Sequence, residues 1–316
     1  MRRIYGQLSL ADGLVSGRSG ALDRIAVFVD WGALERLMGS VQAAPVGRPG
    51  YGPLVLLRCV LLQQWYGLSD PGLEEALGDR LSFRRFVGLS LGDPVPDHST
   101  LSRFRKVLAE GQLGERLLAE INRQLEAKGL VLKRGTLVDA SLVAANARRP
   151  RKGEPRQARS DRDASWNAMP KGGGPHYGYK AHVAVDEGSG LVRQAILTPA
   201  NVSDKTPAPR LIQGDEQAFY ADKGYDGWWL SARLAERGIA DRIMRANYPR
   251  RPLGAREIAR NRAIGRVRSQ VERTFAVLKQ WYGYTRVRYR SLARNALQLH
   301  LLCMAMNLRR GLVLSA

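Results

Sequence analysis

The sequence predicts a mixed α+β protein with an all-helical N-terminal domain followed by a domain built on a mixed five-stranded sheet. Residues 22–130 carry apolar side chains at helical spacing, broken by short turns. From Gly135 the sequence pattern changes to short apolar runs typical of strands, and later strands alternate with helices. We therefore expect an N-terminal arm over 1–20, a helical domain over 21–132 and a sheet domain over 133–316.

The helical domain begins with a segment that is apolar all round, residues 54–65, which predicts a buried helix. Asp70 followed by Pro71 is typical of an N-cap with proline in the first turn, so a helix should run to about Leu77. Residues 82–87 predict another short helix.

A capped helix opens near residues 97–105, where Asp97 or Ser99 serves as the cap. Arg103 and Arg105 are expected on its polar side. Short helices, a turn containing Pro96 and an arginine-bearing helix fit a helix-turn-helix DNA reader. Ordinary three-helix packing gives the same pattern, so both interpretations stand.

The second domain opens with strands expected at 135–143, 179–185 and 191–197, the last two joined by a hairpin at 186–190. Residues 146–175 are basic and rich in Pro and Gly, and they predict a long mobile loop. Shorter strands follow at 218–222 and 239–244. The chain then continues through a basic loop into a helix around Glu272 and a last apolar helix at 292–308.

The charge is the outlying property: 50 Lys and Arg against 29 Asp and Glu give a net +21 and a pI near 10.6. Segment 245–294 holds 14 basic residues against two acids, and segment 146–180 holds nine against three. Such clustering favours a polyanionic partner, nucleic acid before an anionic membrane surface. No apolar run reaches spanning length and no secretory signal is recognisable, so we expect no membrane partner. Cys59 and Cys303 lie in apolar helical patterns and predict buried reduced thiols in a cytosolic protein.

Three carboxylates stand out. Asp139 and Asp222 lie in apolar strand segments, where an ionised side chain needs a partner or a metal. Glu272 lies on a densely basic helix. An all-oxygen set of three suits Mg²⁺ or Mn²⁺, two ions of which would bracket a scissile phosphate. Taken singly, Asp139 capping a turn, Asp222 in an Asx turn and Glu272 paired with Arg268 are each reasonable alternatives.

The chain resembles DDE transposases of bacterial insertion sequences, most closely the IS-five-like group, over most of its length. The matching motifs are VPDHSTLSRFR at 95–105, LVDAS at 137–141, YGYKAHVAVD at 177–186, TPANVSD at 198–204, ADKGYD at 221–226, RSQVERTFAVLK at 268–279 and RVRYR at 286–290. The resemblance implies an RNase H-like core, a helical domain that binds DNA or dimerises, and Asp139, Asp222 and Glu272 as the metal-binding catalytic triad.

The last helix motif matches three positions of the Tyr-Arg-Glu-Lys signature of related transposases, Arg268, Glu272 and Lys279. The tyrosine position is Gly265 here, so the resemblance implies no phosphate contact at this position. Ser203 stands where relatives often have histidine.

Further DNA contacts are expected at Arg268, Lys279 and Lys180, the last of which we expect on the same side of its strand as His182. His182 is more often a satisfied sheet residue than a ligand, and four histidines in all indicate no zinc site. An exposed aromatic at Trp228 or Trp229 could stack an extruded base, although core packing is expected for at least one of them. The remaining candidates for DNA binding are Arg103, Arg105, Arg286, Arg288 and Arg290.

The function implied is a transposase that binds terminal inverted repeats, cleaves DNA there with two metal ions, and joins the 3′-hydroxyl to target DNA by transesterification. A homodimer on DNA, a cytoplasmic, nucleoid-associated location and no small-molecule substrate are expected with it. Two alternatives stay open: a nuclease with the same core that does not join ends, and a catalytically inactive DNA-binding derivative.

Overall fold

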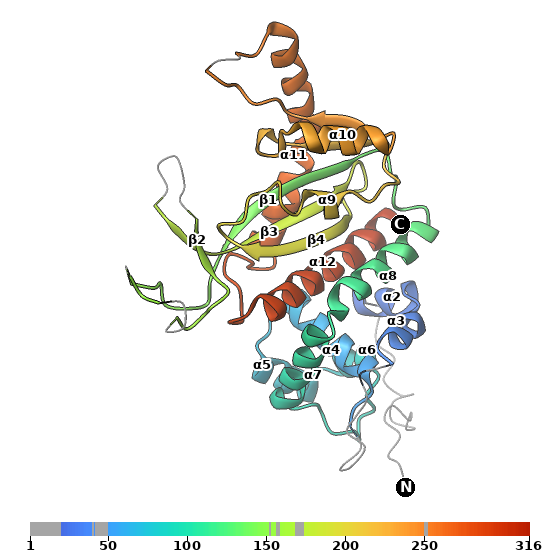
Figure 1. The fold of residues 1–316 in the computed structure, drawn as a ribbon. Helices are drawn as coiled ribbons and strands as arrows, with labels where there is room; N and C mark the ends of the chain where they lie inside the picture. The colour runs from blue at the N-terminus through green and yellow to red at the C-terminus, as the bar shows by residue number, and fades with distance from the viewer. Residues whose placement is uncertain are drawn as a thin grey trace. The chain divides into compact units, whose positions relative to one another are not determined.

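The computed structural model describes residues 20–39, 41, 50–151, 153–155, 159–167, 174–249 and 252–316 (Figure 1). The predicted arm at 1–20 lies outside them except for Gly20. The chain divides into two compact units: the described residues up to Gln124 with His300–Ala316, and Leu125–Leu299. The sequence predicts a single boundary at 132/133, with 300–316 in the sheet domain. By its contacts, the C-terminal stretch groups instead with the N-terminal helices.

The first unit is helical. Its elements are α2 Ala21–Phe28, α3 Trp31–Leu37, α4 Pro53–Tyr66, α5 Asp70–Asp79, α6 Leu81–Val87, α7 His98–Glu110, most of α8 Leu113–Ala127 and the end of α12 Leu292–Leu314. The predicted buried helix is α4, whose residues from Leu56 to Trp65 are almost all buried. Trp65 Nε1 donates to the carbonyl of Ala305 at 2.9 Å, which ties α4 to α12. Cys59 and Cys303 are free and buried, as predicted.

The helix starts differ in one respect from those expected. Asp97 caps α7 by accepting from Thr100 N, which settles the choice between Asp97 and Ser99. The cap of α5 is Ser69 rather than Asp70, because the Ser69 hydroxyl accepts from Gly72 N at 3.1 Å. Asp70 is therefore the first residue of the helix, and its carboxylate is available to a tertiary partner.

That partner is Arg105, so the expectation that Arg105 lies on the polar side of its helix is wrong. Arg105 is 4% exposed, forms an ion pair with Asp70, and donates to Gln63 Oε1 at 3.0 Å. Gln63 in turn donates to Asp70 at 2.6 Å. Arg103, two residues earlier, is exposed and donates to Ser99 Oγ at 3.0 Å.

The second unit is built on a six-stranded sheet (Figure 1). Its strands are β1 Thr136–Ala144, β2 Ser165–Asn167, β3 His176–Asp186, β4 Val192–Pro199, β5 Ala218–Ala221 and β6 Ala240–Ile243. β1 pairs antiparallel with β3 and parallel with β5, β5 pairs parallel with β6, and both β2 and β4 pair antiparallel with β3. The five predicted strands are present. The sixth, β2, lies inside the loop predicted to be mobile; at three residues it is too short to show strand alternation.

Helices cover both faces of the sheet. One face packs against α9 Ala208–Leu211 and α10 Trp228–Glu236 through a core that includes Val138, Phe219 and Leu234. The other packs against α11 Ala255–Gln280, which contacts β1 and β5. Three antiparallel strands followed by two parallel strands with helical connections confirm the RNase H-like topology predicted. A helical N-terminal region precedes it, so the predicted fold class is confirmed.

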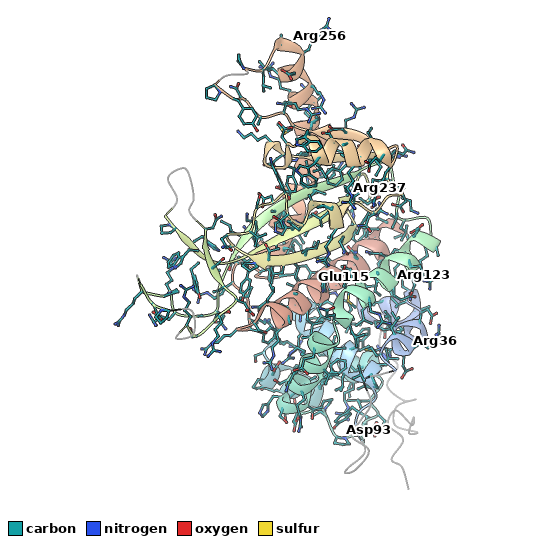
Figure 2. The ribbon with its side chains drawn as sticks, viewed as in Figure 1. Arg36, Asp93, Glu115, Arg123, Arg237 and Arg256 are labelled. Carbon is teal, nitrogen blue, oxygen red and sulfur yellow. The ribbon has the colours of Figure 1, made fainter. Side chains whose placement is uncertain are left out.

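The first turns of α11 extend beyond the sheet. No residue of α11 before Ile264 is buried, and Arg256 lies at the outer end of this extension (Figure 2). Within the described part of the chain, no helix combines the length and apolarity needed to span a membrane.

Candidate active site

The two predicted aspartates lie level with each other on neighbouring strands. β1 and β5 pair in parallel with Leu137 opposite Tyr220. Continuing that register by two residues brings Asp139 opposite Asp222, which directly follows β5. Side chains two apart on a strand share a face, so Asp139 projects toward α11 together with Leu137. The parallel pairing of β1 with β5 therefore aligns the two acids.

Asp222 also holds a local turn. Its carboxylate accepts from Gly224 N at 2.8 Å and caps the 3₁₀ turn η2 Lys223–Tyr225. The Asx-turn alternative raised by the sequence is thus present. Capping and metal binding are compatible roles, since a carboxylate offers two oxygens and about four lone-pair positions.

Glu272 and Arg268 lie one turn apart on α11 but in different surroundings. Glu272 is exposed, whereas Arg268 is 9% exposed. The Arg268 Nη2 atom lies 3.4 Å from Asp139 Oδ1, across the gap between helix and strand. A second Arg268 nitrogen contacts Met244 Sδ at 3.7 Å.

The electrostatics of Asp139 link the three acids. The pKa of Asp139 is raised to about 6, mainly by burial and to a smaller extent by the nearby Asp222 and Glu272 charges. The Ala140 N–H at 2.9 Å and the Arg268 guanidinium oppose that rise in the pKa. Asp139 therefore lies within electrostatic range of both Asp222 and Glu272. No group of three or more His, Cys, Asp or Glu among the described residues is close enough to hold a metal ion.

Lys180 and His182 share one side of β3, as predicted, but it is the face opposite to Asp139. His182 is the cross-strand partner of Ala140, whereas Asp139 pairs with Val183. Lys180 Nζ lies 2.8 Å from Asp204 Oδ1 and donates to the Val202 carbonyl at 2.9 Å. Lys180 therefore fastens the loop after β4 to the sheet.

His182 is fully buried within the same group of polar side chains. Its Nε2 lies 2.9 Å from Thr198 Oγ1, and Nδ1 lies 3.9 Å from Asp204. Burial lowers the pKa of His182 to about 4, and Lys180 contributes to that lowering, against Asp204. The sequence pointed to Asp204 only as the end of a family motif.

Tyr225 was not predicted. It follows Asp222 in the turn and is 1% exposed. Burial raises the pKa of Tyr225, followed by the charges of Asp204, Asp139 and Asp222. The Tyr225 hydroxyl is therefore influenced both by Asp204, beside His182, and by the two aspartates of the candidate active site. Nothing in the sequence indicated this role, because a tyrosine in a turn has no distinctive pattern.

The aromatic candidates separate clearly. Trp228 is 84% exposed at the start of α10, whereas Trp229 packs against the core. Trp281, at the end of α11, is also exposed and was not predicted from the sequence. Lys279 is half-buried two turns after Glu272.

The arginines of the 286–290 segment lie beside the end of β1. Ala144 bridges in parallel to Arg286. Arg286 and Arg290 are exposed and Arg288 is half-buried.

The chain thus combines a helical unit with an RNase H-like sheet that carries Asp139 on β1 and Asp222 directly after β5. The family described as Transposase DDE domain matches residues 132–308, more than half of the chain, and the chain belongs to this family. Residues 10–107 match a second family, described as Transposase domain (DUF772).

Two solved structures are similar at low identity. One is the piggyBac transposase in a synaptic complex with hairpin DNA, at 9% identity over 91% of this chain and 72% of that chain, with a TM-score of 0.45. The other is a pre-cleavage Mos1 transpososome, at 11% identity over 82% of this chain and 96% of that chain, with a TM-score of 0.19.

Proposed function

We propose that this protein is the transposase of a bacterial insertion sequence of the IS-five-like group. It binds the terminal inverted repeats, cleaves DNA at the element ends and joins the 3′-hydroxyl to target DNA. The observation that carries this proposal is the alignment of Asp139 with Asp222 beneath the helix that bears Glu272. Membership of the DDE family supports it.

Asp139, Asp222 and Glu272 would hold Mg²⁺ or Mn²⁺. The donor chemistry suits these ions because all three are carboxylates, and binding would require the acids to come closer together than they lie among the described residues. Two bound ions would supply Lewis-acid chemistry, sharpening the attacking oxygen and stabilising the leaving one.

The remaining residues position DNA. Lys279 lies two turns from Glu272 and so on a neighbouring part of the helix surface, where it binds a phosphate near the cut. Arg268 orients the Asp139 carboxylate through their ion pair and adds a positive charge beside the site of cleavage. Trp228 is exposed enough to stack an unpaired base. Trp229 cannot take this role in the same way, because it packs against the core.

The helical unit contributes Arg103, whose exposed guanidinium suits a phosphate contact by α7. Arg105 is not a candidate in this conformation, because it is committed to Asp70. Lys180 is held by Asp204 and acts by fixing the loop after β4. Because two element ends are cut together, two active sites are needed, and we propose at least a homodimer on DNA.

The decisive experiment incubates the protein with Mg²⁺, labelled element ends and a supercoiled target. Wild type should yield joined products, and Glu272→Gln and Asp139→Asn should bind DNA but neither cut nor join. Glu257→Gln is the matched control, because Glu257 lies on the same helix, where its carboxylate accepts from Gly254 N. Cleavage without joining would favour the nuclease alternative, and binding alone the inactive derivative. A Glu272→Gln protein that still cuts would refute the assignment of the triad.

A further inference from the structure

Two basic segments far apart in the sequence lie side by side at the end of β1. Ala144 N donates to the Thr285 carbonyl at 3.0 Å, and Val287 N donates to the Ala144 carbonyl at 2.9 Å. Asn146 Nδ2 then donates to the Arg288 carbonyl at 2.9 Å. The start of the 146–167 loop therefore runs along the 285–288 segment.

The loop is fastened to the sheet by a buried acid. Asp161 is 0% exposed and accepts from the Tyr179 hydroxyl at 2.8 and 2.9 Å. The Tyr177 hydroxyl donates to the Asp161 carbonyl at 2.8 Å. Asp163 accepts from Leu292 N, the first residue of α12, at 2.9 Å. The described part of the loop is thus clamped to both β3 and the start of α12.

The acids of this region are turned inward while arginines face solvent. Besides Asp161 and Asp163, Glu154 accepts from the Arg148 side chain and from Arg151 N, both at 2.8 Å. Each acid of the loop is thereby engaged within the protein. The exposed basic side chains on the two segments include Arg149, Arg151, Arg286 and Arg290.

We propose that these two segments form one composite surface that binds the phosphate backbone of duplex DNA next to the cut, independently of base sequence. This inference rests on the proposed function, since it takes DNA as the substrate. Charge complementarity supports a polyanion. Ala144 follows Asp139 by five residues on β1, about 17 Å of strand, which corresponds to about five base pairs of duplex. The surface thus holds the duplex flanking the scissile phosphate.

The test measures binding of the full chain to a labelled duplex of random sequence, by fluorescence anisotropy over a range of salt concentrations. Arg149→Ala/Arg151→Ala and Arg286→Ala/Arg290→Ala should each weaken binding and reduce the slope of log K against log salt by about 0.9 for every arginine–phosphate pair removed. The control is Arg233→Ala/Arg237→Ala, where Arg233 lies on α10, Arg237 directly follows it, and both side chains are exposed. Figure 2 labels Arg237 on the side of the sheet away from β2. Slopes equal to wild type, or losses of affinity no larger than the control's, would overturn the proposal.

The clamp is tested by Tyr179→Phe, which removes the hydroxyl that bonds to Asp161. It should lower DNA affinity in the wild type but add little in the Arg149→Ala/Arg151→Ala background, because both changes act through the same loop. Thermal unfolding checks that the variant is folded. Fully additive losses would show that Asp161 does not position these arginines.

Failure of this inference is distinguishable from failure of the proposed function. If the arginine variants bind like wild type while Asp139→Asn abolishes cutting, the composite surface alone is refuted. If Asp139→Asn cuts normally while the arginine variants lose affinity, the proposed catalysis fails and the surface stands as a DNA-binding site.

Discussion

Arg268 lies 3.4 Å from Asp139, so a buried helix arginine is the ion-pair partner of a carboxylate on the central strand. The sequence suggested two other roles for Arg268, a DNA contact and a pair with Glu272. Its side chain is only 10% exposed, and that of Asp139 is 23% exposed. The pair therefore contributes to stability as well as to the orientation of Asp139.

Removing Arg268 should destabilise the protein, because it leaves Asp139 partly buried without its cation. We expect Arg268→Ala to lower the free energy of unfolding by roughly 2–3 kcal/mol, less than the cost of breaking a fully buried pair, because both side chains keep some exposure. Arg268→Lys, which keeps the charge, should lose less. Urea unfolding above pH 7 measures both, and an Arg268→Ala protein as stable as wild type would contradict the importance of the pair.

Arg103 and Arg105 should behave oppositely, although they lie on the same helix. Arg105→Met leaves Asp70 unpaired and should cost about 3–5 kcal/mol in unfolding free energy. Arg103→Ala should change stability by less than about 0.5 kcal/mol, since its side chain is exposed, while weakening DNA binding. Chemical denaturation and anisotropy separate the two effects. If Arg105→Met and Arg103→Ala lowered the free energy of unfolding equally, Arg105 would not be buried in solution.

His182 should make the protein less stable in mild acid. The pKa of His182 is lowered from 6.5 to about 4, so between these values the unfolded chain binds a proton that the folded chain does not. Stability is therefore full above pH 6.5 and falls as the pH approaches 4, by up to about 3 kcal/mol from this group. The charged groups facing it are Asp204 and Lys180.

The His182→Gln variant is the comparison for this pH effect, since glutamine can still bond to Thr198. Its unfolding free energy should fall less between pH 6.5 and 4 than that of wild type. Parallel pH profiles for the two proteins would show that His182 is not the titrating group.

Gly178 should not tolerate a side chain. A Cβ there would lie 2.2 Å from the Val143 carbonyl oxygen and 2.7 Å from Ala145 N, both backbone atoms of or next to β1. Gly178→Ala should therefore cost more than about 3 kcal/mol or prevent folding. Gly174→Ala is the control, because a Cβ there meets nothing within 4 Å. Thermal unfolding of the two variants makes the comparison, and equal melting temperatures would contradict the close approach of β1 and β3.

The sequence predicted most elements because their signals are local. The all-round apolar run at 54–65 became α4, and the runs at 179–185 and 191–197 became β3 and β4. The misses depend on tertiary partners. Arg105 looked like a surface residue because its partner, Asp70, lies 35 positions away. Asp70 looked like a cap because Pro71 follows it, but Ser69 caps the helix instead.

In the candidate site, too, features with a local sequence signal were predicted and features that depend on tertiary contacts were not. The apolar surroundings of Asp139 and Asp222 predicted partly buried acids, and the structure places Asp139 on β1 and Asp222 directly after the neighbouring strand β5. Their metal-binding role, with that of Glu272, stays a prediction. The position of Lys180 on the opposite face could not be predicted, because it depends on the register of β3 against β1.

The C-terminal part of α12 has a consequence for synthesis of the chain. Trp65 bonds to Ala305, and Asn122 accepts from Asn307 at 2.8 Å, so the helical unit needs residues 300–316 to complete its core. During translation the first helices emerge long before those residues. The N-terminal helices must therefore wait for residues 300–316, and until this stretch is available their core stays open to chaperones.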